Sequence, residues 1–130
     1  MDLRAAMLNE MHKAVDSAAT DALGMIETRG VEPVYPPGVE LSASEVAALA
    51  KITVTPELRM AFTKIIRDAA SRPLFQLFAL IDGVADPSAF DGLWLGANVV
   101  ARTDDADHEM WHDELFESYW QYDKSVAPDV

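Results

Sequence analysis

Residues 3–29 read LRAAMLNEMHKAVDSAATDALGMIETR, and their apolar side chains recur at steps of three and four residues. This spacing places them on one face of an α-helix. Gly30 follows as a helix stop. A helix of 27 residues is long for a globular domain, so residues 3–29 are also a candidate homodimer seam. The stripe consists of Met7, Met11, Ala14, Val15, Ala18, Ala22, Met25 and Ile26.

Further helices are predicted downstream of a proline-rich connector. Ser42 and Glu45 have the spacing of a capping box, which starts a short helix through Ala50. Thr55 and Pro56 form an N-cap followed by proline at the first helical position. That helix runs to about Ser71 and is the basic part of the chain, with a buried stripe of Leu58, Phe62, Ile65, Ile66 and Ala69.

Pro73 is predicted to end this helix, and residues 74–81 are then a separate buried segment. Periodicity does not distinguish helix from strand there; we favour helix, because proline can begin one and Gly83 can end one. Residues 92–102 alternate between two faces, as a strand does. A lone strand needs a partner, which residues 52–54, part of 31–35 or a second chain could supply.

A last helix is predicted from Asp107 to Lys124, followed by a frayed tail at residues 125–130. The fold expected for residues 1–130 is one small, mostly α (α+β) domain. It contains four to five helices and one short antiparallel β element that includes residues 92–102.

The composition excludes several functional classes. The chain has 22 acidic and 10 basic residues, and its net charge of −12 argues against binding to nucleic acid or to an anionic membrane. It favours a basic protein partner instead. The sequence contains no cysteine, which excludes disulfides and thiolate chemistry. Neither a targeting segment nor a membrane span is recognisable, so a cytoplasmic protein is expected.

One short motif could carry chemistry. Residues 108–112 read HEMWH, which resembles the HExxH signature of zinc metallopeptidases. The resemblance implies that His108 and His112 bind zinc and that Glu109 acts as the general base. If the first and last helices pack together, His12, His108 and His112 could instead form a three-histidine metal site. The default interpretation needs no cofactor, because both histidines can pack at the rim of an aromatic-rich helix.

The C-terminal helix also combines acidic and aromatic side chains. Residues 103–123 hold eight acidic residues, five of the eleven aromatic residues and no Lys or Arg. Helical spacing predicts a buried face of Trp111, Leu115, Tyr119 and Tyr122. Exposed rings among carboxylates are suited to anchoring a basic protein. We therefore expect a non-enzymatic protein-binding module whose partner-binding residues are Glu109, Asp113, Phe116, Glu117 and Trp120.

Two alternatives need no partner. The acidic residues can be a solvated face, with the two rings packed under residues 82–92. The basic helix 56–71 can also dock against the acidic helix within one chain. A zinc-dependent hydrolase using residues 108–112 remains the alternative function.

Overall fold

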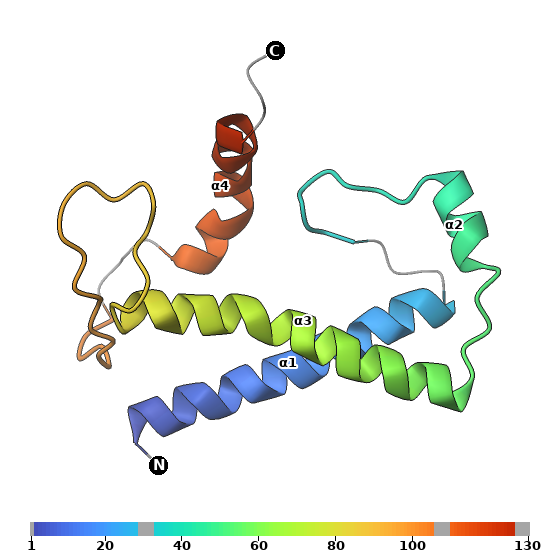
Figure 1. Ribbon diagram of the computed structural model, residues 1–130, viewed down its shortest axis with the longest axis horizontal. Helices are drawn as coiled ribbons and strands as arrows, with labels where there is room; N and C mark the ends of the chain where they lie inside the picture. Colours follow the sequence, from blue (N-terminus) through green and yellow to red (C-terminus); the bar gives the residue numbers. More distant parts are fainter. Residues whose placement is uncertain (1, 29–32, 106–109, 127–130) are drawn as a thin grey trace.

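The computed structural model describes residues 2–28, 33–105 and 110–126, and these residues form four helices (Figure 1). The helices are α1 (Leu3–Thr28), α2 (Ala43–Leu49), α3 (Pro56–Ile81) and α4 (Trp111–Val126). The predicted mostly helical class is therefore confirmed. The described residues contain no strand, so the predicted antiparallel β element is not seen. Within the same residues, none of the helices is both long enough and apolar enough to cross a membrane.

Short polar side chains begin three of these helices. The Asp2 carboxylate accepts a backbone N–H from the first turn of α1 at 2.8 Å. Ser42 and Glu45 form the predicted capping box: each side chain accepts the backbone N–H of the other residue, at 3.2 and 2.7 Å. The Thr55 side chain caps α3 directly before Pro56. The predicted starts of α2 and α3 are thus confirmed.

The centre of the fold is the pair α1 and α3, which lie side by side and cross (Figure 1). The buried apolar residues of the described chain are Ala19, Leu23 and Ala79. Most of the predicted α1 stripe is half-buried, but Ala14 and Ala18 are exposed. The contact is therefore centred on Ala19 and Leu23. α1 carries small residues on more than one face, so the face that is buried depends on how α3 packs against it.

α3 is a single helix that continues through Pro73. The predicted break at this residue is wrong, and residues 74–81 are helical, as favoured, within the same element. Proline removes one backbone hydrogen bond and disfavours the preceding turn. The helix nevertheless continues past Pro73 to Ile81 and packs against α1. Leu58, Phe62 and Ile66 are half-buried as predicted, whereas Ile65 and Ala69 are exposed.

Two ion pairs join the helices of this hairpin. Arg67 Nε lies 2.8 Å from Asp16 Oδ1, and Arg59 Nη2 lies 2.6 Å from Glu27 Oε1. These pairs show that α1 and α3 are antiparallel. Because the side chains are substantially exposed to solvent, each pair contributes little stability, roughly 0.2–1 kcal/mol. Arg59 and Arg67 thus pair with α1, and among the described residues the extensive packing of the basic helix is with α1 and not with the acidic helix.

The segment after α3 packs against the C-terminal end of that helix and hydrogen-bonds its last carbonyls, and it does not form a strand. The Trp94 indole Nε1 donates to the Leu80 carbonyl at 2.8 Å, and the Ala97 backbone N–H donates to the Ile81 carbonyl at 2.8 Å. Gly92 and Gly96 have φ angles of 115° and 99°, which interrupt the extended run. The prediction of a strand over residues 92–102 is wrong for this reason. Residues 52–54 and 33–35 do not form a strand either.

Candidate functional site

α4 projects from the α1–α3 pair (Figure 1), and its described aromatic contacts outside the helix are with the segment before α2. The helix begins at Trp111, four residues after the predicted start. The Met110 carbonyl accepts the N–H groups of Asp113 and Glu114, so Met110 itself precedes the first turn. The structure describes α4 as far as Val126, and residues 127–130 of the expected frayed tail lie outside the described range.

An aromatic cluster attaches α4 to the rest of the chain. The ring of Tyr35 packs edge-on against Tyr119, with centroids 5.5 Å apart, and lies 6.2 Å from the ring of Phe116. Tyr119 also contacts Trp120 and Tyr122. Partial burial, followed by the charge of Asp123 and the neighbouring phenols, raises the pKa of the Tyr119 hydroxyl. A neutral phenol at this position is therefore part of the contact.

The face of α4 that was predicted to be buried is mostly exposed. Trp111, Leu115 and Tyr122 are 80%, 56% and 59% exposed, and of the predicted set Tyr119 is half-buried. The prediction of a buried face is wrong for the other three because α1 already packs against α3, which leaves α4 without a core helix. Spacings of four and seven residues keep the three side chains on one face, which we call the α4 apolar ridge.

The predicted partner-binding residues form a second strip on the same helix. Asp113, Phe116, Glu117 and Trp120 have the spacing of one helical face, and all four are exposed. Phe116 also rests against Tyr35. The fifth predicted residue, Glu109, lies outside the described residues. With Glu114 and Asp123, the helix carries four carboxylates and one cation, Lys124.

The HExxH motif is only partly visible. His108 and Glu109 lie outside the described residues, and His112 is the second residue of α4. The His112 side chain is 76% exposed, with Nε2 3.0 Å from Asp113 Oδ1.

The third predicted metal ligand, His12, is an exposed residue of α1. A three-histidine site was expected to need packing between the first and last helices. In the described chain, the extensive helix packing is between α1 and α3. Among residues 2–28, 33–105 and 110–126, no three His, Asp or Glu side chains are arranged to hold a metal ion. The metal site stays a prediction.

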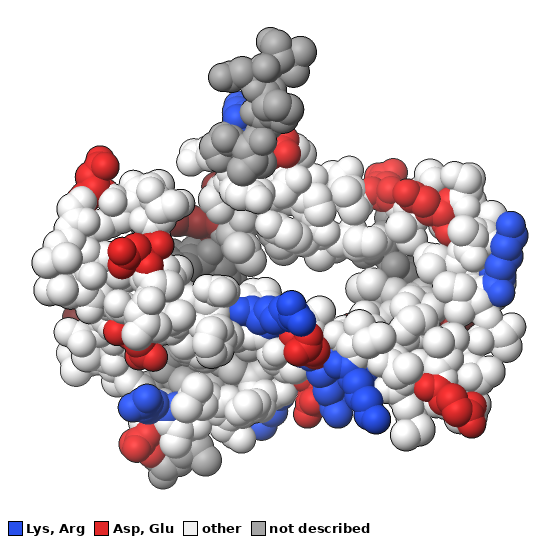
Figure 2. Space-filling view, in the orientation of Figure 1, with Lys and Arg blue, Asp and Glu red and all other residues white. Residues whose placement is uncertain are grey.

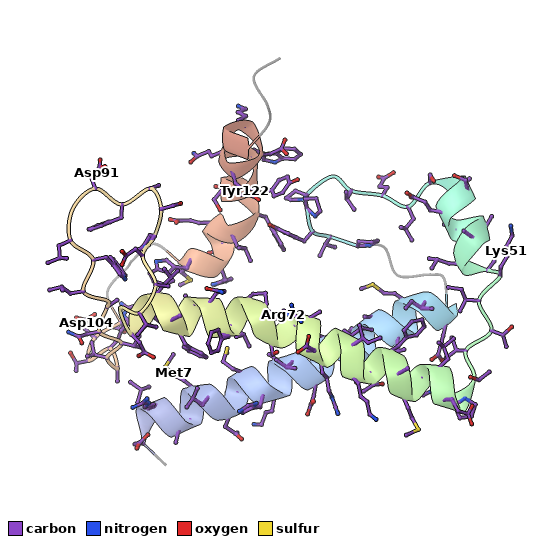
Figure 3. The ribbon with its side chains drawn as sticks, viewed as in Figure 1. Met7, Lys51, Arg72, Asp91, Asp104 and Tyr122 are labelled. Carbon is purple, nitrogen blue, oxygen red and sulfur yellow. The ribbon has the colours of Figure 1, made fainter. Side chains whose placement is uncertain are left out.

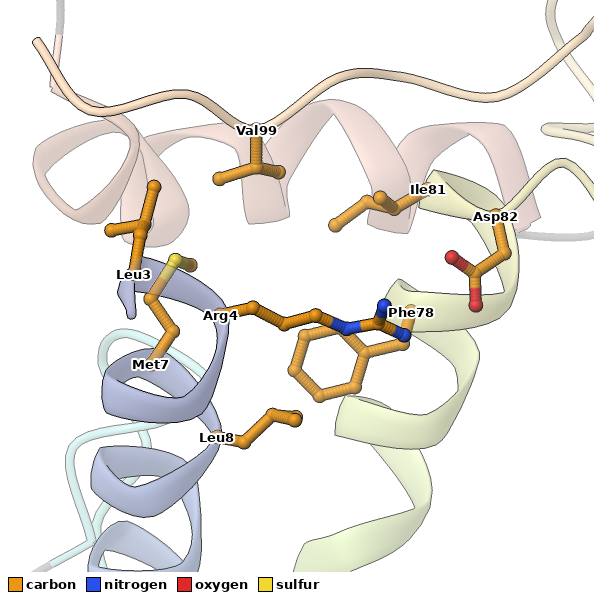
Figure 4. A pocket seen from close by; sticks show the side chains of 8 residues that line it. All are labelled: Leu3, Arg4, Met7, Leu8, Phe78, Ile81, Asp82 and Val99. Atoms are coloured by element: carbon orange, nitrogen blue, oxygen red, sulfur yellow. The ribbon is translucent and has the colours of Figure 1, made fainter. Parts of the chain in front are cut away.

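Sequence analysis did not anticipate a cleft of about 390 Å³ where α1 begins and α3 ends (Figure 4). Its walls are mainly apolar, with Arg4 and Asp82 as the charged groups. A signal was present in the sequence, because apolar residues are dense in the first two turns of α1. The other lining residues are Leu3, Met7, Leu8, Phe78, Ile81 and Val99.

The chain has no significant match to any protein-family model, curated protein or solved structure.

Proposed function

We propose that the chain is a non-enzymatic protein-binding module and that α4 carries its recognition surface for a basic protein. The observation that supports this proposal is the α4 apolar ridge, whose members are more than half exposed on a helix that also bears four carboxylates. Burial of a large apolar side chain contributes roughly 1.5–3 kcal/mol. A partner that covers this helix would bury several such side chains, and each would add its contribution to the free energy of binding.

The two kinds of side chain have different roles in this proposal. Carboxylates, including Asp113, Glu117 and the undescribed Glu109, attract a basic surface and accelerate association. Trp120 and the ridge supply the rings that hold the complex together. Phe116 contributes through its contact with Tyr35, which fixes the orientation of α4.

Affinity capture with the tagged full-length chain tests this proposal. We expect the tagged chain to capture a basic protein, or an untagged second copy through a basic face of that copy. Capture should decrease as the salt concentration rises. Trp120→Ala should weaken capture, and the combination Glu109→Gln, Asp113→Asn and Glu117→Gln should slow association. Glu40→Gln with Asp91→Asn is the matched control, because both residues are exposed and lie outside α4. Equal capture by the α4 variants and the control would contradict a recognition role for α4.

A zinc-dependent hydrolase built on residues 108–112 is the second candidate. It is favoured by the His112–Asp113 contact, since histidines that bind metal commonly donate their other ring N–H to a carboxylate. Elemental analysis after purification in metal-free buffer and incubation with zinc tests it. Stoichiometric zinc that is lost in His108→Ala would support the hydrolase. A metal-free protein under the same conditions would remove this candidate.

A further inference from the structure

The side of α3 that faces away from α1 carries a second amphipathic surface. Its residues follow one helical face and are all exposed; Ile65 is 63% and Phe75 71% exposed. Arg72, labelled in Figure 3, lies near the middle of α3, and in the same orientation Figure 2 shows basic side chains beside an opening in the molecule. We call this surface the α3 outer face, and it consists of Ala61, Lys64, Ile65, Asp68, Arg72 and Phe75.

The chain exposes far more surface than a compact monomer. Its accessible surface is 10,750 Å², whereas a compact monomer of 14.3 kDa exposes roughly 6,800 Å². The difference is about 4,000 Å² per chain. Stable dimers bury about 1,200–2,000 Å² in total, and obligate dimers bury more. The excess is therefore larger than a dimer interface requires.

The α3 outer face and the α4 apolar ridge match in length. Trp111 and Tyr122 lie eleven residues apart, or about 16 Å along a helix. Ile65 and Phe75 lie ten residues apart, or about 15 Å. Two helices placed antiparallel, with Trp111 beside Phe75, would also bring Tyr122 close to the turn that holds Ile65. Each ring of the ridge then meets an exposed apolar side chain.

The charges agree with this same alignment. Placing Trp111 beside Phe75 sets Glu114 opposite Arg72 and Asp123 opposite Thr63, next to Lys64. α3 carries four basic and two acidic residues, and α4 carries four acidic residues and one basic residue. Arg72 is paired with Asp68 at 2.7 Å, but both side chains are exposed and such a pair is readily exchanged. Antiparallel helix dipoles favour the same orientation.

Within one chain these two surfaces do not pack together along their length, because the extensive packing of α3 is with α1 and α4 is attached at Tyr35. We infer that the occupant of the α3 outer face is α4 of a second copy of this chain. A two-fold axis then repeats the contact, with each α4 on the partner's α3. This inference rests on the proposed function and names the basic partner of α4.

A charge exchange between two variants tests the inference. Glu114→Arg places like charges opposite Arg72 in both contacts of the dimer, and Arg72→Glu does the same with Glu114. Each variant alone is expected to dimerise roughly tenfold or more weakly, since two pairs change from attraction to repulsion. In an equimolar mixture, each contact of the mixed dimer joins opposite charges. We therefore expect the mixture to recover dimers in sedimentation velocity.

Three controls keep the outcome interpretable. Circular dichroism of each variant alone measures helix content, and recovery in the mixture itself shows that both variants fold. Asp91→Arg changes an exposed charge outside both surfaces and should dimerise like the wild type. Leu115→Glu should weaken the dimer without rescue by Arg72→Glu.

Several results would overturn the inference. A wild-type chain that stays monomeric at micromolar concentration would do so, as would a dimer that neither variant weakens. A mixture that fails to recover dimers while both variants are helical would also count against it. If such a chain still captures a different basic protein through α4, the proposed function stands and this inference fails. If the α4 variants affect neither dimer nor capture, both fail.

Discussion

At Gly96 the segment after α3 lies against the end of that helix so closely that no side chain fits. A Cβ added there would overlap the Ile81 carbonyl oxygen, and φ is +99°, which favours glycine. Gly96→Ala should therefore destabilise the chain by about 2–4 kcal/mol, through backbone strain and loss of the Ala97–Ile81 hydrogen bond. Urea unfolding followed by circular dichroism measures this change.

Gly24 provides the matched control for this prediction. It lies inside α1, and an added Cβ would meet nothing within 4 Å. Gly24→Ala should stabilise the chain by roughly 0.5–1 kcal/mol, because alanine loses less backbone entropy in a helix. Equal effects of the two substitutions would show that residues 92–97 do not close the end of α3.

Tyr119 links the attachment of α4 to pH. Burial, together with the charge of Asp123 and the phenols of Tyr35 and Tyr122, raises its pKa above 10.0. Because the folded-state pKa is the higher one, the contribution of Tyr119 to stability is complete below pH 10 and is lost as pH rises through the folded-state pKa. In a titration of tyrosinate absorbance, Tyr119→Phe should remove the component that titrates above the ordinary tyrosine pKa. If the component lost in this variant titrates at or below the ordinary tyrosine pKa, the assignment is contradicted.

At the scale of single elements, α3 is held as one helix although Pro73 lies inside it. Proline in a helix interior costs about 3 kcal/mol relative to alanine. Pro73→Ala restores an N–H that can donate to the Ala69 carbonyl, and it should stabilise the chain by about 1–3 kcal/mol. Thermal unfolding tests this expectation. A lower midpoint in Pro73→Ala would mean that the local geometry set by proline is needed for packing on α1.

The elements that the sequence predicted well are those whose signals are local. The capping box of Ser42 and Glu45 and the Thr55–Pro56 start depend on neighbouring residues, and both were confirmed. The strand over residues 92–102 was predicted from alternation alone. Its actual hydrogen bonds go to carbonyls of Leu80 and Ile81, which are distant in sequence. No local pattern contains that information.

The part of the candidate site that follows from composition could be predicted from the sequence. Charge and aromatic content directed the functional prediction to the C-terminal helix, and four of the five predicted partner-binding residues lie exposed on α4. Helical spacing also identified the face of Trp111, Leu115 and Tyr122, but not whether a core covers it. That depends on which helices pair, and α1 with α3 leaves α4 outside the pair.

At the scale of the whole molecule, folding and association should be coupled. Ala19, Leu23 and Ala79 are the buried apolar residues of the described chain, and they form a small core for a protein of 130 residues. If a second copy covers the α3 outer face, association adds to the stability of the folded state in proportion to the logarithm of concentration. The thermal midpoint should rise by a few degrees for about a tenfold increase in protein concentration. In Glu114→Arg this dependence should become much weaker, and in the equimolar mixture with Arg72→Glu it should return. A midpoint that is independent of concentration in the wild type would mean that the open α1–α3 pair and α4 are stable as a monomer.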